Sequence, residues 1–310
     1  MNSSESVKGG FDHFAYYVNS FVGIFGFLSN AFIVAVLSNS TSLKGKHYIF
    51  LKNLAVSDCL ASAILFLNAL IPSIRTPTGA VSSYYLLANL ACSMKANNPL
   101  YAAFTNSAVI ISVISVERLI AVKFPIFYKK SFGKKLCYIF VIFPWSYSSA
   151  FFALSNHFSF TIKDGYCYQN WNNFYLGVIN AINYYLMQLI LPVFCYSIIA
   201  FDISQRITKS NSGKKNANKI ISKAQAKITK MLFIVTVIFI VTTFPDNVHF
   251  NFFLLILNVQ LWSFESVIHQ ILLLLAMINI LINIFIYPII DSDFKRAVIK
   301  MLSRMVFKKK

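Results

Sequence analysis

The sequence predicts an all-α integral membrane protein, a seven-transmembrane helix bundle followed by a C-terminal amphipathic helix on the membrane surface. Three observations support this fold class. Of the 310 residues, 57% are hydrophobic and only 12% are charged, whereas a soluble domain carries about 25% charged residues. The hydrophobic residues form seven runs of membrane-spanning length. The cations gather between these runs, mostly on one side of the expected bundle.

The seven runs fix the expected spans, because about 20 apolar residues in a helix cross the hydrocarbon core. The chain shows no internal repeat or inverted pair of halves, which counts against a transporter. The expected spans cover residues 14–37, 48–73, 99–122, 136–155, 174–201, 228–258 and 264–290. The chain then divides into a short extracellular N-terminus (1–13), a seven-transmembrane domain (14–290) and a cytoplasmic amphipathic helix with a basic tail (291–310).

The distribution of the cations predicts the orientation of the chain. Cytoplasmic loops carry an excess of Lys and Arg, and all but four of the 28 lysines and arginines lie on one side. We therefore expect a multi-pass protein of the plasma membrane with its N-terminus outside and its C-terminus in the cytoplasm. The net charge of +18 can also indicate nucleic-acid binding. Because the basic clusters separate the spans, we expect the lipid bilayer, and no nucleic acid, as the partner of these cations.

The two ends of the chain carry further signals. The N-terminus lacks the features of a removable signal peptide, so the first span is expected to direct its own insertion. Asn2 begins an Asn-Ser-Ser sequon, which can be glycosylated on the outside. After the last span, apolar residues recur at helical spacing opposite cations, which predicts a helix on the inner leaflet, capped by Asp293 or Ser292. The apolar positions are Phe294, Ala297, Val298, Met301, Leu302 and Met305.

Several polar residues lie inside the expected spans. Asp58 is in the middle of the second span, where an ionisable group costs about 3 kcal/mol on insertion scales. Asn30, Ser107, Asn279 and Asn283 lie in three other spans. If these faces converge, they form an oxygen-lined cage around one carboxylate, suited to a small monovalent cation, water or a proton. The alternative is a structural cluster whose hydrogen bonds hold the helices together.

At these positions the chain resembles the rhodopsin-like (class A) G protein-coupled receptors, as a divergent member without an identified ligand. The resemblance rests on Asn30, the Leu-Ala-Val-Ser-Asp run at 54–58, the Ser-Val-Glu-Arg-Leu run at 115–119 and Trp145, and extends from about residue 23 to 296. It implies that Asp58, with Ser107, Asn279 and Asn283, is a sodium site that stabilises the inactive state. It implies no other metal or cofactor.

The end of the third span carries the expected coupling residues. The resemblance implies that Arg118, beside Glu117, holds the resting state and later faces the G protein. A snorkelling arginine at a span end is the alternative, but Pro125 and Tyr128 follow at the family spacing. Many family members place an acidic partner for the arginine in the sixth span. Here Gln225 stands at that position, so we expect no ionic lock between spans three and six.

Pro245 is the expected pivot of the sixth span. A proline inside a helix removes a backbone hydrogen bond and leaves a kink. Members of the family usually have a tryptophan two residues earlier, where this chain has Thr243. We therefore expect Phe239, one turn away, to act as the packing switch.

In the seventh span, Asn279, Asn283 and Tyr287 share one face because they are four residues apart. Asn283 and Tyr287 match the family's Asn-Pro-x-x-Tyr signature, except that Ile284 replaces the proline. Pro288 follows the tyrosine directly. We expect the bend of this helix to be shifted rather than lost.

The five cysteines divide by their expected depth. Cys92 and Cys167 lie outside, in the oxidising compartment. The resemblance implies a disulfide between them, although Cys92 lies one residue before the position that the family's cysteine occupies. We expect Cys59, Cys137 and Cys195 to be small buried residues.

The outer ends of the spans offer candidates for a ligand pocket, an apolar cavity with a few polar groups. Amine receptors of the family have an aspartate where this chain has Leu100, and opsins have a lysine where it has Met277, which argues against amines and retinal. Asp246 is the best candidate for meeting a cationic ligand group, as in a peptide, unless it is a solvated span end. The pocket candidates are Leu100, Tyr101, Asn183, Asp246, His249 and His269, with Asn97, Asn98, Asn180, Asn247 and Glu265 nearby.

The expected function is therefore that of a receptor. An unidentified extracellular ligand would shift the helices toward a state that activates a heterotrimeric G protein. A non-signalling seven-span partner or decoy is the alternative, favoured by Leu119, Thr243 and Ile284. A transporter or channel is less expected, because a single carboxylate and one end-lying arginine are few charges for a conduction path. We expect no enzyme, since the histidines form no ligand-spaced pair.

Overall fold

The computed structural model describes residues 3–70, 92, 98–130, 132–163, 166–169, 174–211, 223–251 and 267–307. Its elements are, in chain order, α1 (Ser3–Asn39), α2 (Lys46–Leu70), α4 (Asn98–Lys123), α5 (Pro125–Lys130), α6 (Lys134–Ser159), β1 (Phe160–Lys163), β2 (Tyr166–Gln169), α7 (Phe174–Ala181), the π-helix η1 (Ile182–Ile190), α8 (Leu191–Asn211), α9 (Lys223–Asn251), α10 (Val267–Ile290) and α11 (Ser292–Phe307).

Seven of these helical units are long and apolar enough to cross a membrane, which confirms the predicted fold class. Their spans of 20 to 28 residues match the thickness of the hydrocarbon core at 1.5 Å per residue. The spans are Tyr17–Asn39, Lys46–Ala69, Pro99–Lys123, Lys135–His157, Val178–Gln205, Ile228–His249 and Ile271–Ile290. The protein is thus a multi-pass membrane protein.

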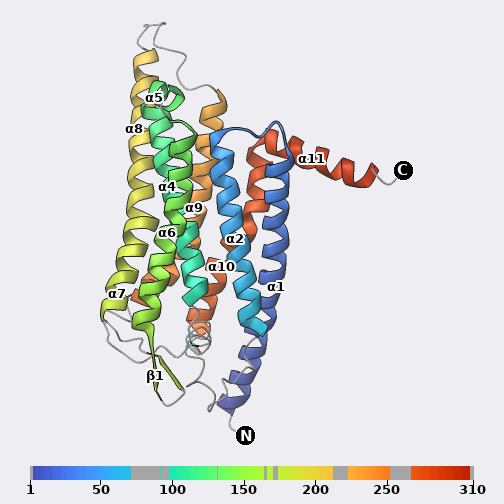
Figure 1. The fold of residues 1–310 in the computed structure, drawn as a ribbon, viewed down its shortest axis with the longest axis vertical. Coiled ribbons are helices and arrows are strands. Elements are labelled where there is room, and N and C mark those ends of the chain that lie inside the picture. Colours follow the sequence, from blue (N-terminus) through green and yellow to red (C-terminus); the bar gives the residue numbers. More distant parts are fainter. Residues whose placement is uncertain are drawn as a thin grey trace.

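The helices run side by side, and α4 forms the centre of the bundle. Within its most apolar window 72% of the residues of α4 are buried, against 22% for α6. Figure 1 shows α1 beginning at one end of the bundle, whereas α5 and α11 lie at the other end. An antiparallel β-hairpin of β1 and β2, which the sequence analysis did not anticipate, follows α6 at the end where α1 begins.

Glycines allow α1 to approach its neighbours closely. A Cβ atom added to Gly26 would lie 2.6 Å from Ser62 Oγ and 2.8 Å from a methyl carbon of Ile280. A Cβ atom on Gly23 would lie 2.8 Å from Phe66 Cβ. Small residues at helix interfaces let backbones come together in membranes, where close packing replaces the hydrophobic driving force. The glycines therefore bring α1 against both α2 and α10.

The fifth span is interrupted by the π-helix η1, which lies between α7 and α8. In π geometry the N–H of residue 192 would donate to the carbonyl of residue 187, but Pro192 has no N–H. The Ser112 hydroxyl in α4 donates to the carbonyl of Met187 instead. The proline and the serine together fix η1 against α4. The hydrophobic pattern predicted a helix over this whole range but not its change of pitch.

The turn between α10 and α11 corrects the predicted cap of the last helix. The backbone N–H of Asp293 donates to Asp291 Oδ1 at 2.9 Å, so Asp291 is the N-cap rather than Asp293 or Ser292. Tyr48 Oη donates to the other oxygen of Asp291 at 2.7 Å. Phe294 is buried beneath the new helix and its ring lies 5.7 Å from that of Tyr287, measured between centroids. The start of α11 is thus anchored to both α2 and α10.

Candidate functional site

Asp58 is the centre of a buried polar cluster shared by α2, α4 and α10. Its side chain lies in the middle of α2, and the residue is 2% exposed. Ser107 Oγ donates to Asp58 Oδ1 at 2.8 Å, and Asn283 Nδ2 donates to Asp58 Oδ2 at 2.8 Å. Three helices thus supply the carboxylate and its donors, as the sequence predicts.

Two residues that the sequence analysis did not select extend this cluster into α4. Ser57 Oγ lies 2.9 Å from Ser107 Oγ, and Asn106 Nδ2 donates to Ser57 Oγ at 2.9 Å. A hydroxyl has one proton and two lone pairs, so Ser57 can donate to Ser107 while Ser107 donates to Asp58. Ser57 and Asn106 each directly precede a predicted member of the cage. Two adjacent polar residues inside a membrane span are the sequence feature from which both could have been predicted.

Asn30 and Asn279 are the other two predicted members of the cage. Asn30 is fully buried, and its Nδ2 donates to the carbonyl oxygens of Gly26 and Ile280, both at 2.9 Å. Asn279 is also buried. Within the described part of the chain, neither side chain bonds to Asp58. Asn30 instead joins α1 to α10, because the glycine at 26 lets the helices approach closely enough for one amide to reach both backbones.

Buried oxygen atoms remain available around this cluster. Among the described residues, the side-chain oxygens of Asn30, Asn106 and Asn283 accept no hydrogen bond. A buried acceptor without a donor carries a desolvation cost of about 1–3 kcal/mol. Each of these oxygens is therefore suited to accept a hydrogen bond from water or to face a cation.

Glu117 and Arg118 form a buried ion pair at the end of α4. Glu117 is 0% exposed and Arg118 is 2% exposed. The guanidinium binds the neighbouring carboxylate, and the Tyr128 hydroxyl in α5 donates to the same carboxylate. Arg118 Nη2 also donates to Tyr128 Oη at 3.3 Å. Loss of solvent raises the pKa of Tyr128, and the negative charge of Glu117 raises it further, so this phenol stays a neutral donor.

Pro125 and Tyr128, which the sequence predicts beside this ion pair, differ in whether they contact it. Pro125 begins α5 and is exposed, so it orients the short helix without touching the pair. Tyr128 reaches back to the pair and closes it from outside the membrane span. The Gln225 side chain lies outside the described residues.

Lys46, counted in the sequence only as a cytoplasmic cation, connects α2 to the chain around α5. Its Nζ donates to the carbonyl oxygens of Tyr128 at 2.9 Å and of Phe132 at 2.5 Å. It also lies 4.5 Å from the centroid of the Tyr128 ring and 5.4 Å from that of Phe132, within range of a cation–π contact. Lys46 therefore positions the tyrosine that closes the Glu117–Arg118 pair.

A second polar link joins η1 to α9 beside the predicted pivot Pro245. Asn247 Nδ2 donates to Gln188 Oε1 at 3.0 Å, and Thr243 Oγ1 lies 3.4 Å from the same oxygen. Thr243 Oγ1 donates at 2.7 Å to the carbonyl of Phe239, which is itself 1% exposed. The residue that replaces the family's tryptophan is thus a hydrogen-bonded threonine. The sequence analysis did not select Gln188 as a site residue, because the direction in which its side chain points depends on the π-helix.

The residues predicted to contact a ligand differ in how far they are buried. Leu100 and Asp246 are buried, and Tyr101 and His249 are half-buried. Asn183 in η1 is buried, and its Nδ2 donates to Thr105 Oγ1 in α4 at 3.0 Å. His269, Asn97 and Glu265 lie outside the described side chains, as does Asn2 at the N-terminus.

Cys137 and Cys195 are buried as predicted, but Cys59, which was expected to be buried, is only half-buried. Cys92 is disulfide-bonded, and Cys59, Cys137 and Cys195 are free. Cys167, the predicted partner of Cys92, lies opposite Ile162 in the hairpin, and its side chain is outside the described residues.

Comparison with known families is consistent with these clusters. The family described as 7 transmembrane receptor (rhodopsin family) matches residues 29–287. This range starts one residue before Asn30 and ends at Tyr287, so it contains the Asp58 cluster and the Glu117–Arg118 pair. It ends before α11.

We predict that Lys46→Met lowers the unfolding temperature of the purified protein. The substitution keeps an unbranched side chain but leaves two carbonyl groups without their donor, at a cost of about 1 kcal/mol. The measurement is thermal denaturation in detergent micelles. Lys44→Met is the matched control, because Lys44 is an exposed lysine that lies two residues before Lys46. Equal unfolding temperatures for the two variants would show that the contacts of Lys46 contribute nothing.

Proposed function

Because this chain belongs to the rhodopsin family of seven-transmembrane receptors, we propose that an extracellular ligand shifts its helix bundle to a state that activates a heterotrimeric G protein. The observation that carries this proposal is the buried Glu117–Arg118 pair, closed by Tyr128. It lies at the end of the bundle that also holds α5 and α11 (Figure 1). A buried guanidinium at this end can be exposed to a cytoplasmic partner when the helices rearrange.

The energetics of the pair favour a two-state arrangement. Removing one partner of a buried ion pair costs about 3–5 kcal/mol, because the remaining charge is left uncompensated. Arg118 is therefore released only when another acceptor replaces Glu117. Carbonyl oxygens of a bound G protein are acceptors of this kind. A ligand contributes by binding one arrangement of the helices more tightly than the other.

The link between η1 and α9 supports a route from the outer pocket to this pair. Gln188 holds Asn247 and approaches Thr243 on either side of Pro245. A ligand that displaces Gln188 would free the segment around the kink, which lies above Phe239 in α9. By this route α9 would respond to a ligand with a threonine in place of the usual tryptophan.

Arg118→Ala is expected to abolish G protein activation. The measurement is nucleotide exchange in membranes that contain the full chain and a promiscuous Gα subunit, with and without a library of candidate ligands. Lys135→Ala, which removes an exposed cation at the start of α6, is expected to keep the wild-type rate. A wild-type chain that activates no Gα subunit, or an Arg118→Ala chain that exchanges nucleotide at the wild-type rate, would contradict the proposal.

The Asp58 cluster is proposed to hold a sodium ion that stabilises the inactive state. The carboxylate supplies the charge, and the hydroxyl of Ser107 with the unpaired oxygen of Asn283 supplies neutral ligands. Hard monovalent cations bind such oxygen ligands through charge and coordination number. The bound cation would neutralise a carboxylate that has no basic partner among the described residues. The alternative is that the cluster only holds the helices together.

Asp58→Asn is expected to erase a sodium-dependent increase in stability. In the wild type, replacing choline chloride by sodium chloride at constant ionic strength should raise the unfolding temperature. At ten times the dissociation constant the gain is about 1.4 kcal/mol. Asn keeps the shape of the side chain but removes the charge. Asp202→Asn, which changes a half-buried carboxylate of α8, should keep the response, and a wild type that responds equally to both salts would favour the structural alternative.

The ligand is proposed to be a small molecule or peptide other than a biogenic amine or retinal. Leu100 and Met277 are apolar and buried, 3% and 1% exposed. Neither offers a counter-ion or a Schiff base at the positions that amine receptors and opsins use. Asp246 lies next to Pro245 on α9 and is buried, so a cationic ligand group that reached it would gain a strong partner.

The N-terminus is proposed to be extracellular and the C-terminus cytoplasmic, with the plasma membrane as the location. The support is the basic composition of α11, which lies at the opposite end of the bundle from the start of α1 (Figure 1). An epitope placed before α1 should bind antibody on intact cells. Staining that requires permeabilised cells would reverse the orientation.

A second candidate, a non-signalling partner protein, is favoured by Ile284 in place of the family's proline. Receptors of this family are generally not enzymes, and we propose no catalytic role. The nucleotide-exchange experiment separates the two candidates, because a non-signalling protein would leave every Gα subunit inactive.

A further inference from the structure

The start of α11 is packed against the bundle, whereas its later turns leave it. Phe294 and Ala297 are buried, 1% and 8% exposed. No residue between 298 and 304 is buried. Figure 1 shows the helix running past the end of α1 and away from the bundle. The later turns of α11 are therefore accessible to a partner.

These turns carry an exposed apolar face. Ile299 and Leu302 are 56% and 47% exposed, and residues three apart lie on the same side of a helix. Val298 and Met301, their neighbours in the chain, are half-buried. In the sequence Val298, Met301, Leu302 and Met305 have the spacing i, i+3, i+4 and i+7. This is the spacing of anchors in helices that bind in the groove of another protein.

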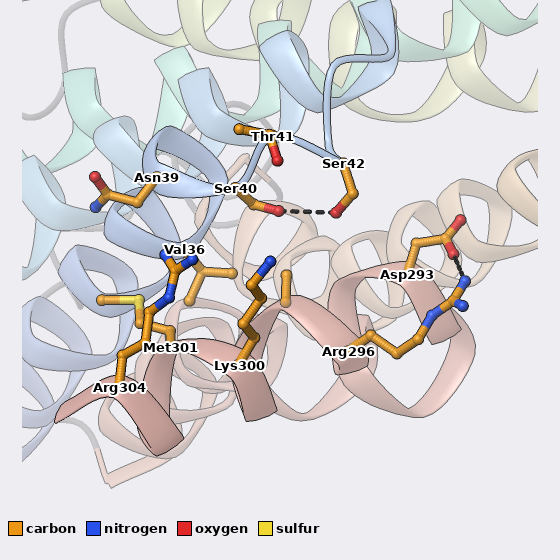
Figure 2. A pocket seen from close by; sticks show the side chains of 11 residues that line it. Val36, Asn39, Ser40, Thr41, Ser42, Asp293, Arg296, Lys300, Met301 and Arg304 are labelled. Carbon is orange, nitrogen blue, oxygen red and sulfur yellow. Dashed lines mark hydrogen bonds and ion pairs between the residues drawn. The ribbon is translucent and has the colours of Figure 1, made fainter. Parts of the chain in front are cut away.

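The remainder of the helix is basic. It contains four cations and one acidic residue, and that residue, Asp293, forms an ion pair with Arg296. Among the described residues, Lys300 and Arg304 have no acidic partner. Figure 2 shows both side chains directed from α11 toward the turn after α1. A partner of complementary charge is therefore acidic.

The arrangement of these residues favours a protein groove over a flat bilayer. At 100° per residue the apolar side chains of α11 occupy roughly 200° of its circumference, with Ala297 and Ile299 at the edges. Lys295 is exposed and lies within this arc, four residues before Ile299. A bilayer contacts one side of a helix. A groove surrounds the helix and can pair a cation inside the apolar arc with a carboxylate.

We propose that the later turns of α11 dock into the acidic, methionine-lined groove of a calcium-loaded EF-hand protein. Calcium opens such a groove and exposes its methionines, whose flexible side chains adapt to irregular apolar faces. A basic amphipathic helix is the kind of target that these proteins bind. The proposal requires α11 to lie on the cytoplasmic side, as proposed above, but it requires neither a ligand nor an active G protein.

The test measures binding of fluorescently labelled calmodulin to the purified full chain in detergent micelles, with calcium or with EGTA. The wild type should bind only in calcium. Ile299→Ser/Leu302→Ser, the serine variant, should bind about thirtyfold or more weakly, because it lacks two apolar anchors. Ile299→Met/Leu302→Met should keep binding, which separates loss of contact from misfolding. The matched control is Ile126→Ser/Phe127→Ser, which changes residues of α5 that are 71% and 47% exposed and should bind like the wild type.

The same assay tests charge and the membrane. Lys300→Gln/Arg304→Gln should weaken binding more than Lys129→Gln/Lys130→Gln, because only the first pair lies on α11. No binding in calcium, equal binding in EGTA, or wild-type affinity of the serine variant would each overturn the proposal. Binding that is lost in nanodiscs of phosphatidylcholine and phosphatidylserine would also overturn it and assign the exposed face to the membrane. Because no G protein is present, none of these results bears on nucleotide exchange.

Discussion

A carboxylate in the middle of a membrane-spanning helix has to find its hydrogen-bond donors on other helices, because lipid supplies none. Asp58 meets this requirement with one donor from α4 and one from α10. The three helices are consequently held in one relative arrangement. Asn30 adds α1 to it through backbone carbonyls. The packing of the bundle therefore depends on a few polar contacts as well as on close apolar contact.

The end of the bundle that holds α5 and α11 also depends on a buried charged group whose partners lie within the protein. Arg118 is paired with its own neighbour in the chain, and the groups that hold this pair closed come from α5 and, one step further away, from Lys46. No contact in the described residues ties Arg118 to α9. Among the side chains that the structure describes, the only ion pair of Arg118 is therefore the one within α4.

Hydrophobic runs and charge bias predicted the spans, because membrane thickness and positive loops impose simple patterns on a sequence. The contacts of Asp58 with Ser107 and Asn283 were also predictable, since residue type and family position both indicate them. The acceptors of Asn30 could not be predicted, because one amide can reach several acceptors and only the close approach at Gly26 decides which. Lys46 and Asp291 act through turns whose geometry has no periodic pattern. Gln188 depends on the pitch of η1.

The π-helix has a consequence for how this receptor can vary. A π-turn accommodates one more residue than an α-turn, so the segment before η1 has a rotational phase set by the length of that insertion. Deleting a single residue between 182 and 190 would let the ordinary pitch return and would change which side chains of this stretch face α4, the contact of Asn183 with Thr105 among them. A change in the length of this stretch therefore alters more contacts than a single substitution does, and related chains that differ in length here should be compared by the direction that their side chains face rather than by residue count.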